Sequence, residues 1–213
     1  MKAIVFSSGE MRSYDYLRDT DFSDCLVICA DNGYSHAKAL EIVPDVIVGD
    51  NDSYKAEYPN GIEHYVFPPE KDKTDTNIAI DLAIERGCTE IELYGGLGGR
   101  IDQEFSHFCL IKYALEHGVR LKMIDDINEI WMENKSFTLE YRADKKYVSF
   151  FAYGGYVMHT SIKGFKYEAE DMTLSPGLVQ ASSNEFLPER GGSVEFESGT
   201  VIVMLCSDRN NGV

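Results

Sequence analysis

Short apolar runs alternate with helical patterns through the first part of the chain. The apolar runs predict strands at 2–7, 25–30, 45–49, 63–67, 90–94 and 120–124. Apolar residues recur at helical spacing at 32–40, 76–86 and 102–117. Strands that alternate with helices are typical of a mostly parallel sheet with crossover helices. We therefore expect an N-terminal α/β domain built on a mostly parallel sheet.

The pattern changes after Asn134, where the helical spacing ends. Short strand-like segments follow, separated by glycine, proline or charged turns, at 136–141, 146–152, 156–162, 165–169, 178–182, 193–196 and 200–206. Many short strands at close spacing are typical of an antiparallel sandwich or barrel. We expect an α/β domain at 1–134 and a C-terminal antiparallel β-sandwich at 135–213.

Charge and composition narrow the possible partners. The 213-residue chain has 20 Lys and Arg against 36 Asp and Glu, a formal net charge of −16. This charge disfavours nucleic acid and anionic membrane surfaces. No stretch approaches the roughly 20 apolar residues of a membrane span, and the N-terminus turns polar too soon for a signal peptide. The 5 cysteines lack disulfide or zinc spacing, so we expect a reducing, cytoplasmic location.

Aspartates follow four of the expected strands in the first half. They are Asp31, Asp50, Asp52, Asp72, Asp75 and Asp102. Parallel strands would bring these loops to one edge of the sheet, where open α/β sheets bind ligands. Carboxylates gathered there repel one another unless a cation and a phosphate ligand share the site. A Mg²⁺-nucleotide is the natural occupant, which makes the chain an enzyme candidate.

A glycine-rich run at 95–100 follows the strand expected at 90–94. It is not a dinucleotide fingerprint, because Ile101 stands where the third glycine belongs, and the chain has no Walker-type phosphate loop. A plain strand-to-helix turn is the simplest explanation for the glycines alone. With Arg100 and Asp102 attached, we favour a loop whose N–H groups and guanidinium contact phosphate oxygens.

Four acidic motifs resemble, in order and spacing, those of the thiamine pyrophosphokinases. They are Asp31-Asn32-Gly33, Gly49-Asp50-Asn51-Asp52-Ser53, Lys71-Asp72-Lys73-Thr74-Asp75-Thr76 and Gly98-Gly99-Arg100-Ile101-Asp102. In the second half, Gly164-Phe165-Lys166-Tyr167 and Ser182-Ser183-Asn184 resemble the tail motifs of the same family. The match spans most of the chain.

The resemblance implies a transferase that moves a diphosphoryl group from ATP to the hydroxyl of thiamine, giving thiamine diphosphate and AMP. It also implies Mg²⁺ as cofactor and a homodimer with the active site at the subunit interface. The implied fold is an α/β nucleotide domain followed by a β-sandwich that contributes to acceptor binding and dimerisation. The change of pattern near residue 135 agrees with that division.

The resemblance also implies roles for individual residues. The metal and catalytic aspartates would be Asp50, Asp52, Asp72 and Asp75, with Asp102 as a further ligand or as the base and Arg100 on phosphate oxygens. ATP would contact Asp31, Asn32, Lys73, Thr74, Gly98, Gly99 and Gln103, and thiamine would contact Tyr167, Ser182, Ser183 and Asn184. For any single aspartate a helix N-cap is the commoner role, and we expect Asp75 and Asp102 to cap helices as well.

Three residues depart from the family pattern. Asn32 replaces a glycine, Asn51 replaces a bulky apolar residue, and Gln103 replaces a histidine for which His107, one turn on, is a partial substitute. Two other functions remain open. One is a relative that binds a nucleotide or thiamine without turnover. The other is a metal-dependent phosphohydrolase, because Asp50-Asn51-Asp52 mimics an Asp-x-Asp nucleophile pair.

Overall fold

A computed structural model describes residues 1–49, 61–66 and 72–209. The chain forms two compact units, Met1–Asp126 (unit 1) and Ile127–Val213 (unit 2). Sequence pattern had placed the division after Asn134. The segment between the two positions contains a strand that pairs antiparallel with the last strand of the chain, and it therefore belongs to unit 2.

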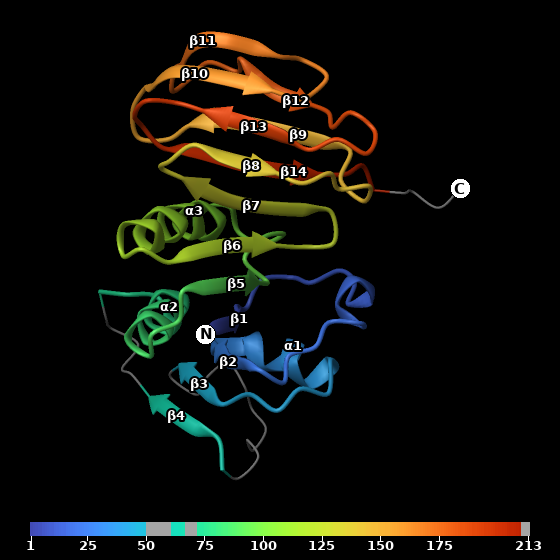
Figure 1. Ribbon diagram of the computed structural model, residues 1–213. Helices are drawn as coiled ribbons and strands as arrows, with labels where there is room; N and C mark the ends of the chain where they lie inside the picture. Colours follow the sequence, from blue (N-terminus) through green and yellow to red (C-terminus); the bar gives the residue numbers. More distant parts are fainter. Residues whose placement is uncertain (50–60, 67–71, 210–213) are drawn as a thin grey trace. The chain divides into compact units, whose positions relative to one another are not determined.

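The described residues of unit 1 form six parallel strands in the order β6-β5-β1-β2-β3-β4 (Figure 1). They are β1 (Lys2–Phe6), β2 (Cys25–Ala30), β3 (Val46–Gly49), β4 (Glu63–Val66), β5 (Glu90–Tyr94) and β6 (Arg120–Ile124). Every pairing among them is parallel. Parallel neighbours need crossover connections, and the helices α1 (Tyr34–Ala39), α2 (Asp75–Glu85) and α3 (Ile101–Glu116) lie in those connections. The 3₁₀ turns η1 (Asp15–Leu17) and η2 (Asp31–Gly33) complete unit 1.

The central strand of unit 1 is buried on both faces. Within β1, Ala3 through Phe6 are fully buried. The strand lies between β2 and β5, and α1 and α2 both contact it. Helix α2 packs against β1, β2 and β3, and α3 packs against β6. The edge strand β4 has exposed and half-buried side chains instead. The continuous apolar runs of the inner strands therefore fix the sheet, and the loops that follow them carry the polar residues.

Unit 2 consists of antiparallel strands in two sets, β12-β9-β14-β7 and β11-β10-β13-β8. They are β7 (Asn128–Glu133), β8 (Phe137–Leu139), β9 (Tyr147–Ala152), β10 (Val157–Lys163), β11 (Ala169–Leu174), β12 (Ala181–Asn184), β13 (Gly192–Glu195) and β14 (Val201–Cys206). One hydrophobic core draws side chains from both sets, including Phe150 of β9 and Ile162 of β10.

The coarse expectation, a mixed α/β part followed by antiparallel strands, is confirmed. Three details differ. The segment expected as a helix from residue 32 starts as the 3₁₀ turn η2, with α1 following from Tyr34. The segment 165–169 is not a strand, because buried Phe165 lies in the turn after β10 and makes only an isolated bridge to Phe186. Strands β7 and β11 were not expected at all.

No helix among the described residues is both long enough and apolar enough to span a membrane.

Candidate active site in unit 1

A cavity of about 590 Å³ lies where β1, β2 and β5 end and α2 and α3 begin. The carboxylates that line it are Glu10, Asp31, Asp72, Asp75 and Glu104, and the cations are Lys73 and Arg100. This is the carboxyl edge of the parallel sheet, where the sequence placed the ligand site. Acidic side chains and backbone amides together suit a ligand that combines metal ions with phosphates.

The loops after β1 and β5 form one wall through backbone contacts. The Ser7 amide donates to the Tyr94 carbonyl at 2.8 Å, and the Gly9 amide donates to the Gly95 carbonyl at 2.9 Å. A Cβ on Gly9 would lie 2.2 Å from the Gly95 oxygen, so glycine is required for this approach. The two loops are therefore held at a fixed separation beside the cavity.

The start of α2 is tied to the same wall. The Ser7 and Thr76 hydroxyls lie 2.8 Å apart, and both residues are buried. The Thr74 hydroxyl accepts from the Asn77 amide at 3.2 Å and caps the helix. The expectation that Asp75 caps α2 is wrong: Asp75 is the first helical residue, and its charge complements the helix N-terminus. Its carboxylate remains on the cavity wall.

Asp72 and Lys73 precede this cap and line the cavity. Asp72 is exposed. The Lys73 ammonium donates to the Asp81 carboxylate at 2.7 Å, and this hydrogen bond is the main cause of a raised Lys73 pKa. In this structure Lys73 is therefore bound to α2, and it has to exchange that partner to hold a phosphate.

The loop after β2 brings Asp31 to the cavity. Asp31 has a φ of 53°, in the left-handed region that is costly for residues other than glycine. A Cβ on Gly33 would lie 2.0 Å from the Phe6 carbonyl oxygen, so the loop packs directly on the end of β1. Asn32 does not line the cavity, and its carbonyl accepts from the Ser35 hydroxyl at 2.7 Å. The structure thus supports Asp31 as a site residue more strongly than Asn32.

Arg100 forms a two-point ion pair with Asp102. Its Nη2 lies 2.6 Å from Oδ2, and its Nε donates to Oδ1 at 3.1 Å. The pair is exposed, and the hydrogen bond from Arg100 is the largest cause of the lowered pKa of Asp102. Asp102 lies outside the cavity lining, and it does not cap α3, whose N-cap residue is Arg100. A carboxylate with a lowered pKa accepts a proton poorly, so Asp102 is a weak base as long as it is paired with Arg100.

Two further side chains of α3 contact the glycine-rich run at 95–100, which we call the glycine loop. Glu104 Oε1 accepts from the Gly98 and Gly99 amides, each at 2.9 Å. His107 Nδ1 donates to the Gly96 carbonyl at 2.8 Å, and burial lowers the His107 pKa. Gln103 and His107 both line the cavity, as expected if they serve the nucleotide.

The sequence did not reveal several residues that line this cavity, among them Ser7, Glu10, Thr76 and Glu104. Ser7 follows the first strand, just as Asp31 follows the second, so its position was the available signal. Thr76 stands inside a motif that was noticed for its aspartates. Nothing in the spacing distinguished Glu104 from a solvated helix residue.

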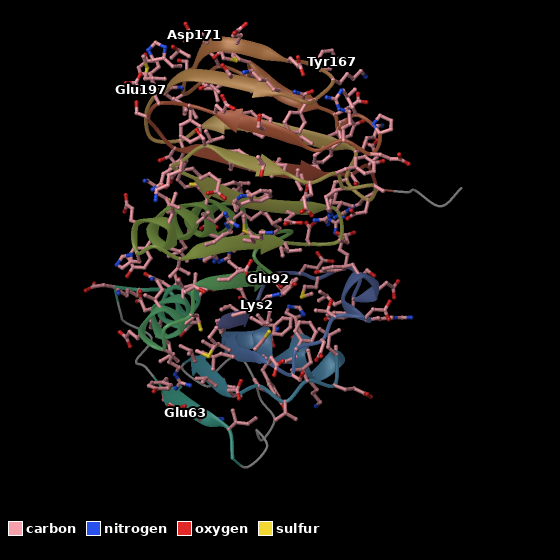
Figure 2. All side chains as sticks on the ribbon, viewed as in Figure 1. Lys2, Glu63, Glu92, Tyr167, Asp171 and Glu197 are labelled. Atoms are coloured by element: carbon pink, nitrogen blue, oxygen red, sulfur yellow. The ribbon has the colours of Figure 1, made fainter. Side chains whose placement is uncertain are left out.

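The residues expected to bind thiamine lie in unit 2. Tyr167, in the turn between β10 and β11, is 60% exposed (Figure 2). Asn184 is buried: its Oδ1 accepts from the Tyr167 amide at 2.9 Å, and its Nδ2 donates to the Tyr167 carbonyl at 2.7 Å. The Ser183 amide donates to the Ser149 hydroxyl at 2.9 Å, and Ser182 is half-buried. Asn184 therefore contacts Tyr167, and its side-chain amide is bound to the Tyr167 backbone.

Asp50 and Asp52 lie outside the described residues. Among the residues that are described, no three His, Cys, Asp or Glu side chains form a group able to hold a metal ion.

Two family models cover most of the chain. The thiamin pyrophosphokinase catalytic domain matches residues 20–123, and the thiamin pyrophosphokinase vitamin B1 binding domain matches residues 136–201. A thiamine pyrophosphokinase of Bacillus subtilis is 28% identical over 173 residues, which are 78% of this chain and 80% of that protein.

Solved structures give the same result over the full length. The Bacillus subtilis thiamine pyrophosphokinase structure superimposes with a TM-score of 0.89 at 24% identity, covering 98% of this chain and 100% of that one. The Geobacillus thermodenitrificans thiamin pyrophosphokinase structure gives 0.86 at 26% identity, covering 99% of each chain. With both family models matched in order, this chain belongs to the thiamine pyrophosphokinase family.

Proposed function

We propose that this protein is an ATP-dependent thiamine diphosphokinase, which converts ATP and thiamine to AMP and thiamine diphosphate. The observation that carries the proposal is the carboxylate-lined cavity at the carboxyl edge of the unit 1 sheet, in a chain that matches both family domains. A binding protein without turnover would have little use for so many carboxylates around one phosphate site.

The reaction forms one P–O bond and breaks another. The thiamine hydroxyl oxygen attacks the β-phosphorus, the bond from that phosphorus to the α,β-bridging oxygen breaks, AMP leaves, and the hydroxyl proton is released. Catalysis of phosphoryl transfer consists largely of positioning and charge stabilisation. Arg100 lines the cavity, and its guanidinium can make two-point contacts, so it would hold phosphate oxygens after exchanging Asp102 for them.

The donor chemistry of the cavity fits Mg²⁺. Magnesium usually binds through one or two carboxylates together with phosphate oxygens and water, so a complete protein cage is not needed. Asp72 and Asp75, which line the cavity, would hold the Mg²⁺ ion, and we propose Asp50 and Asp52 as the other ligands. When bound, the metal neutralises charge on the polyphosphate. Asp31 and Gln103 line the same cavity and would orient the nucleotide.

For the acceptor, we propose that Tyr167 supplies the aromatic face against which the thiamine cation lies. Ser182 and Ser183 would offer hydrogen bonds to the aminopyrimidine. Asn184 holds the backbone of Tyr167, so its contribution to thiamine binding would be indirect. Because both strand sets of unit 2 share one core, we describe that unit as a β-sandwich.

Product analysis tests the proposed reaction. The purified protein with Mg²⁺, ATP and thiamine should release AMP and thiamine diphosphate in equal amounts, as measured by ³¹P NMR and chromatography. Release of ADP and thiamine monophosphate would show transfer of a single phosphoryl group. Phosphate release without thiamine, through a covalent aspartyl-phosphate, would favour the metal-dependent phosphohydrolase.

We also propose a homodimer with the active site at the subunit interface, and a cytoplasmic location. Tyr167 is exposed and so is available to a second subunit. Sedimentation at assay concentrations should show a dimer, whereas a fully active monomer would rule out a shared site.

A further inference from the structure

The glycine loop at the cavity is held by one helix rather than left open for phosphate. Glycines occupy four of the positions 95–99, so this backbone loses more conformational entropy on ordering than ordinary sequence does. Three hydrogen bonds with α3 side chains order it: the loop donates two to Glu104 and accepts one from His107. Glu104 and His107 lie on one face of the helix, since they are three positions apart.

The two bonds to Glu104 are charge-assisted. One carboxylate oxygen accepts both the Gly98 and the Gly99 amide at 2.9 Å, which is the arrangement by which successive backbone amides bind an anion. Glu104 also lies in the first turns of α3, where a negative charge is favourable. The position that a phosphate oxygen would take on these amides is therefore already filled from within the chain.

We propose that Glu104 is a positioning residue, which fixes the glycine loop and so places Arg100, the next residue along, at the cavity wall. The proposal rests on the proposed function for its ligand, the polyphosphate of ATP. It changes the roles expected for Gly98 and Gly99: their amides bind the Glu104 carboxylate, and Arg100 contacts the phosphates. Because Glu104 acts through the loop, its loss should weaken ATP binding much more than thiamine binding.

Amide hydrogen exchange and calorimetry test this on the full-length protein. Glu104→Ala should speed exchange at Gly98 and Gly99, and should weaken binding of a non-hydrolysable ATP analogue with Mg²⁺ by about tenfold or more, the scale of a lost charge-assisted hydrogen bond. Glu104→Gln, which keeps an acceptor oxygen without the charge, should fall between wild type and alanine. Glu116→Gln, at the other end of α3, is the matched control and should change neither quantity.

Three outcomes would overturn the proposal. Unchanged exchange at Gly98 and Gly99 in both Glu104 variants would show that the carboxylate does not hold the loop. Tighter binding of the analogue would show that Glu104 blocks phosphate from those amides. An equal rise in KM for ATP and thiamine would indicate a general structural role. Amide exchange and analogue binding do not depend on turnover. They therefore test the positioning role of Glu104 even if the wild type makes no thiamine diphosphate.

Discussion

The cavity of unit 1 and the Tyr167 region of unit 2 were both predicted from motifs, yet they are built differently. In unit 1, carboxylates from separate loops face one cavity, and backbone contacts such as that between Gly9 and Gly95 hold those loops. In unit 2, the polar groups of the motif bond to one another: Asn184 binds both backbone groups of Tyr167. Motif residues therefore divide into those that face the cavity and those that hold the backbone of a neighbouring motif residue.

The largest effect should come from the cavity carboxylates. Asp72→Asn and Asp75→Asn should each lower kcat by about 10²-fold or more, because each would remove charge that we propose to organise the metal and polyphosphate. Stability should change by no more than about 1 kcal/mol, the scale of a helix-dipole contribution at Asp75. Steady-state kinetics and urea unfolding measure the two effects. Asp19→Asn, an exposed acid outside the cavity lining, is the control. Near-normal turnover in both variants would remove these residues from the site.

Substitution of Asn184 should instead affect stability more than turnover. Asn184→Ala removes a buried amide that bonds to three backbone groups, those of Tyr167 and the amide of Glu185, and should cost about 2 kcal/mol of unfolding free energy. Ser183→Ala is the matched control for stability alone, since the bond from Ser183 to Ser149 uses the backbone amide and survives the change. A stable Asn184→Ala protein with a selective rise in KM for thiamine would mean that the side chain contacts the acceptor directly.

Tyr167 tests whether unit 2 binds the acceptor. Tyr167→Ala should raise KM for thiamine by about 2- to 30-fold, the range equivalent to a cation–π contact of roughly 0.5–2 kcal/mol, and should change KM for ATP little. Tyr167→Phe keeps the aromatic face and should behave nearly as wild type. Equal losses for both substrates would take Tyr167 out of the thiamine site.

The smallest effect concerns pH, and its sign differs between the units. Burial lowers the pKa of His36 and His107 in unit 1, so their contribution to stability is present at neutral pH and is lost as pH falls below the ordinary value of about 6.5. In unit 2, His159 forms a hydrogen bond to Asp171 at 2.6 Å and lies 3.4 Å from Glu197; both acids are labelled in Figure 2. The hydrogen bond to Asp171 is the largest cause of the raised pKa of His159.

The stabilisation from His159 is therefore complete below about pH 6.5 and is lost as pH rises through its raised pKa. Urea unfolding at several pH values should show that His107→Gln lessens the loss of stability in acid. His159→Gln should instead lower stability in acid and leave it unchanged at higher pH. Identical pH profiles for the two variants would contradict these assignments.

The sequence predicted the inner strands of unit 1 well because they are buried on both faces and read as unbroken apolar runs, as β1 and β2 do. It missed β11 because only Leu174 of that strand is buried and acidic residues interrupt the pattern. It missed β7 because polar residues at both ends shorten its apolar run.

For the cavity, position after a strand was enough to predict that Asp31, Asp72 and Asp75 lie near one another, because parallel strands end at one edge. The contacts of Glu104 could not be predicted, since they depend on how the glycine loop turns back toward α3. The sequence also did not show that Thr74, and not the expected Asp75, caps α2.

A crystal structure with Mg²⁺, a non-hydrolysable ATP analogue and thiamine tests the central claim most directly. We expect the polyphosphate in the unit 1 cavity, with Arg100 on its oxygens, Mg²⁺ on Asp72 or Asp75, and the β-phosphorus facing the thiamine hydroxyl. Polyphosphate bound away from the carboxylate-lined cavity would contradict the proposed active site.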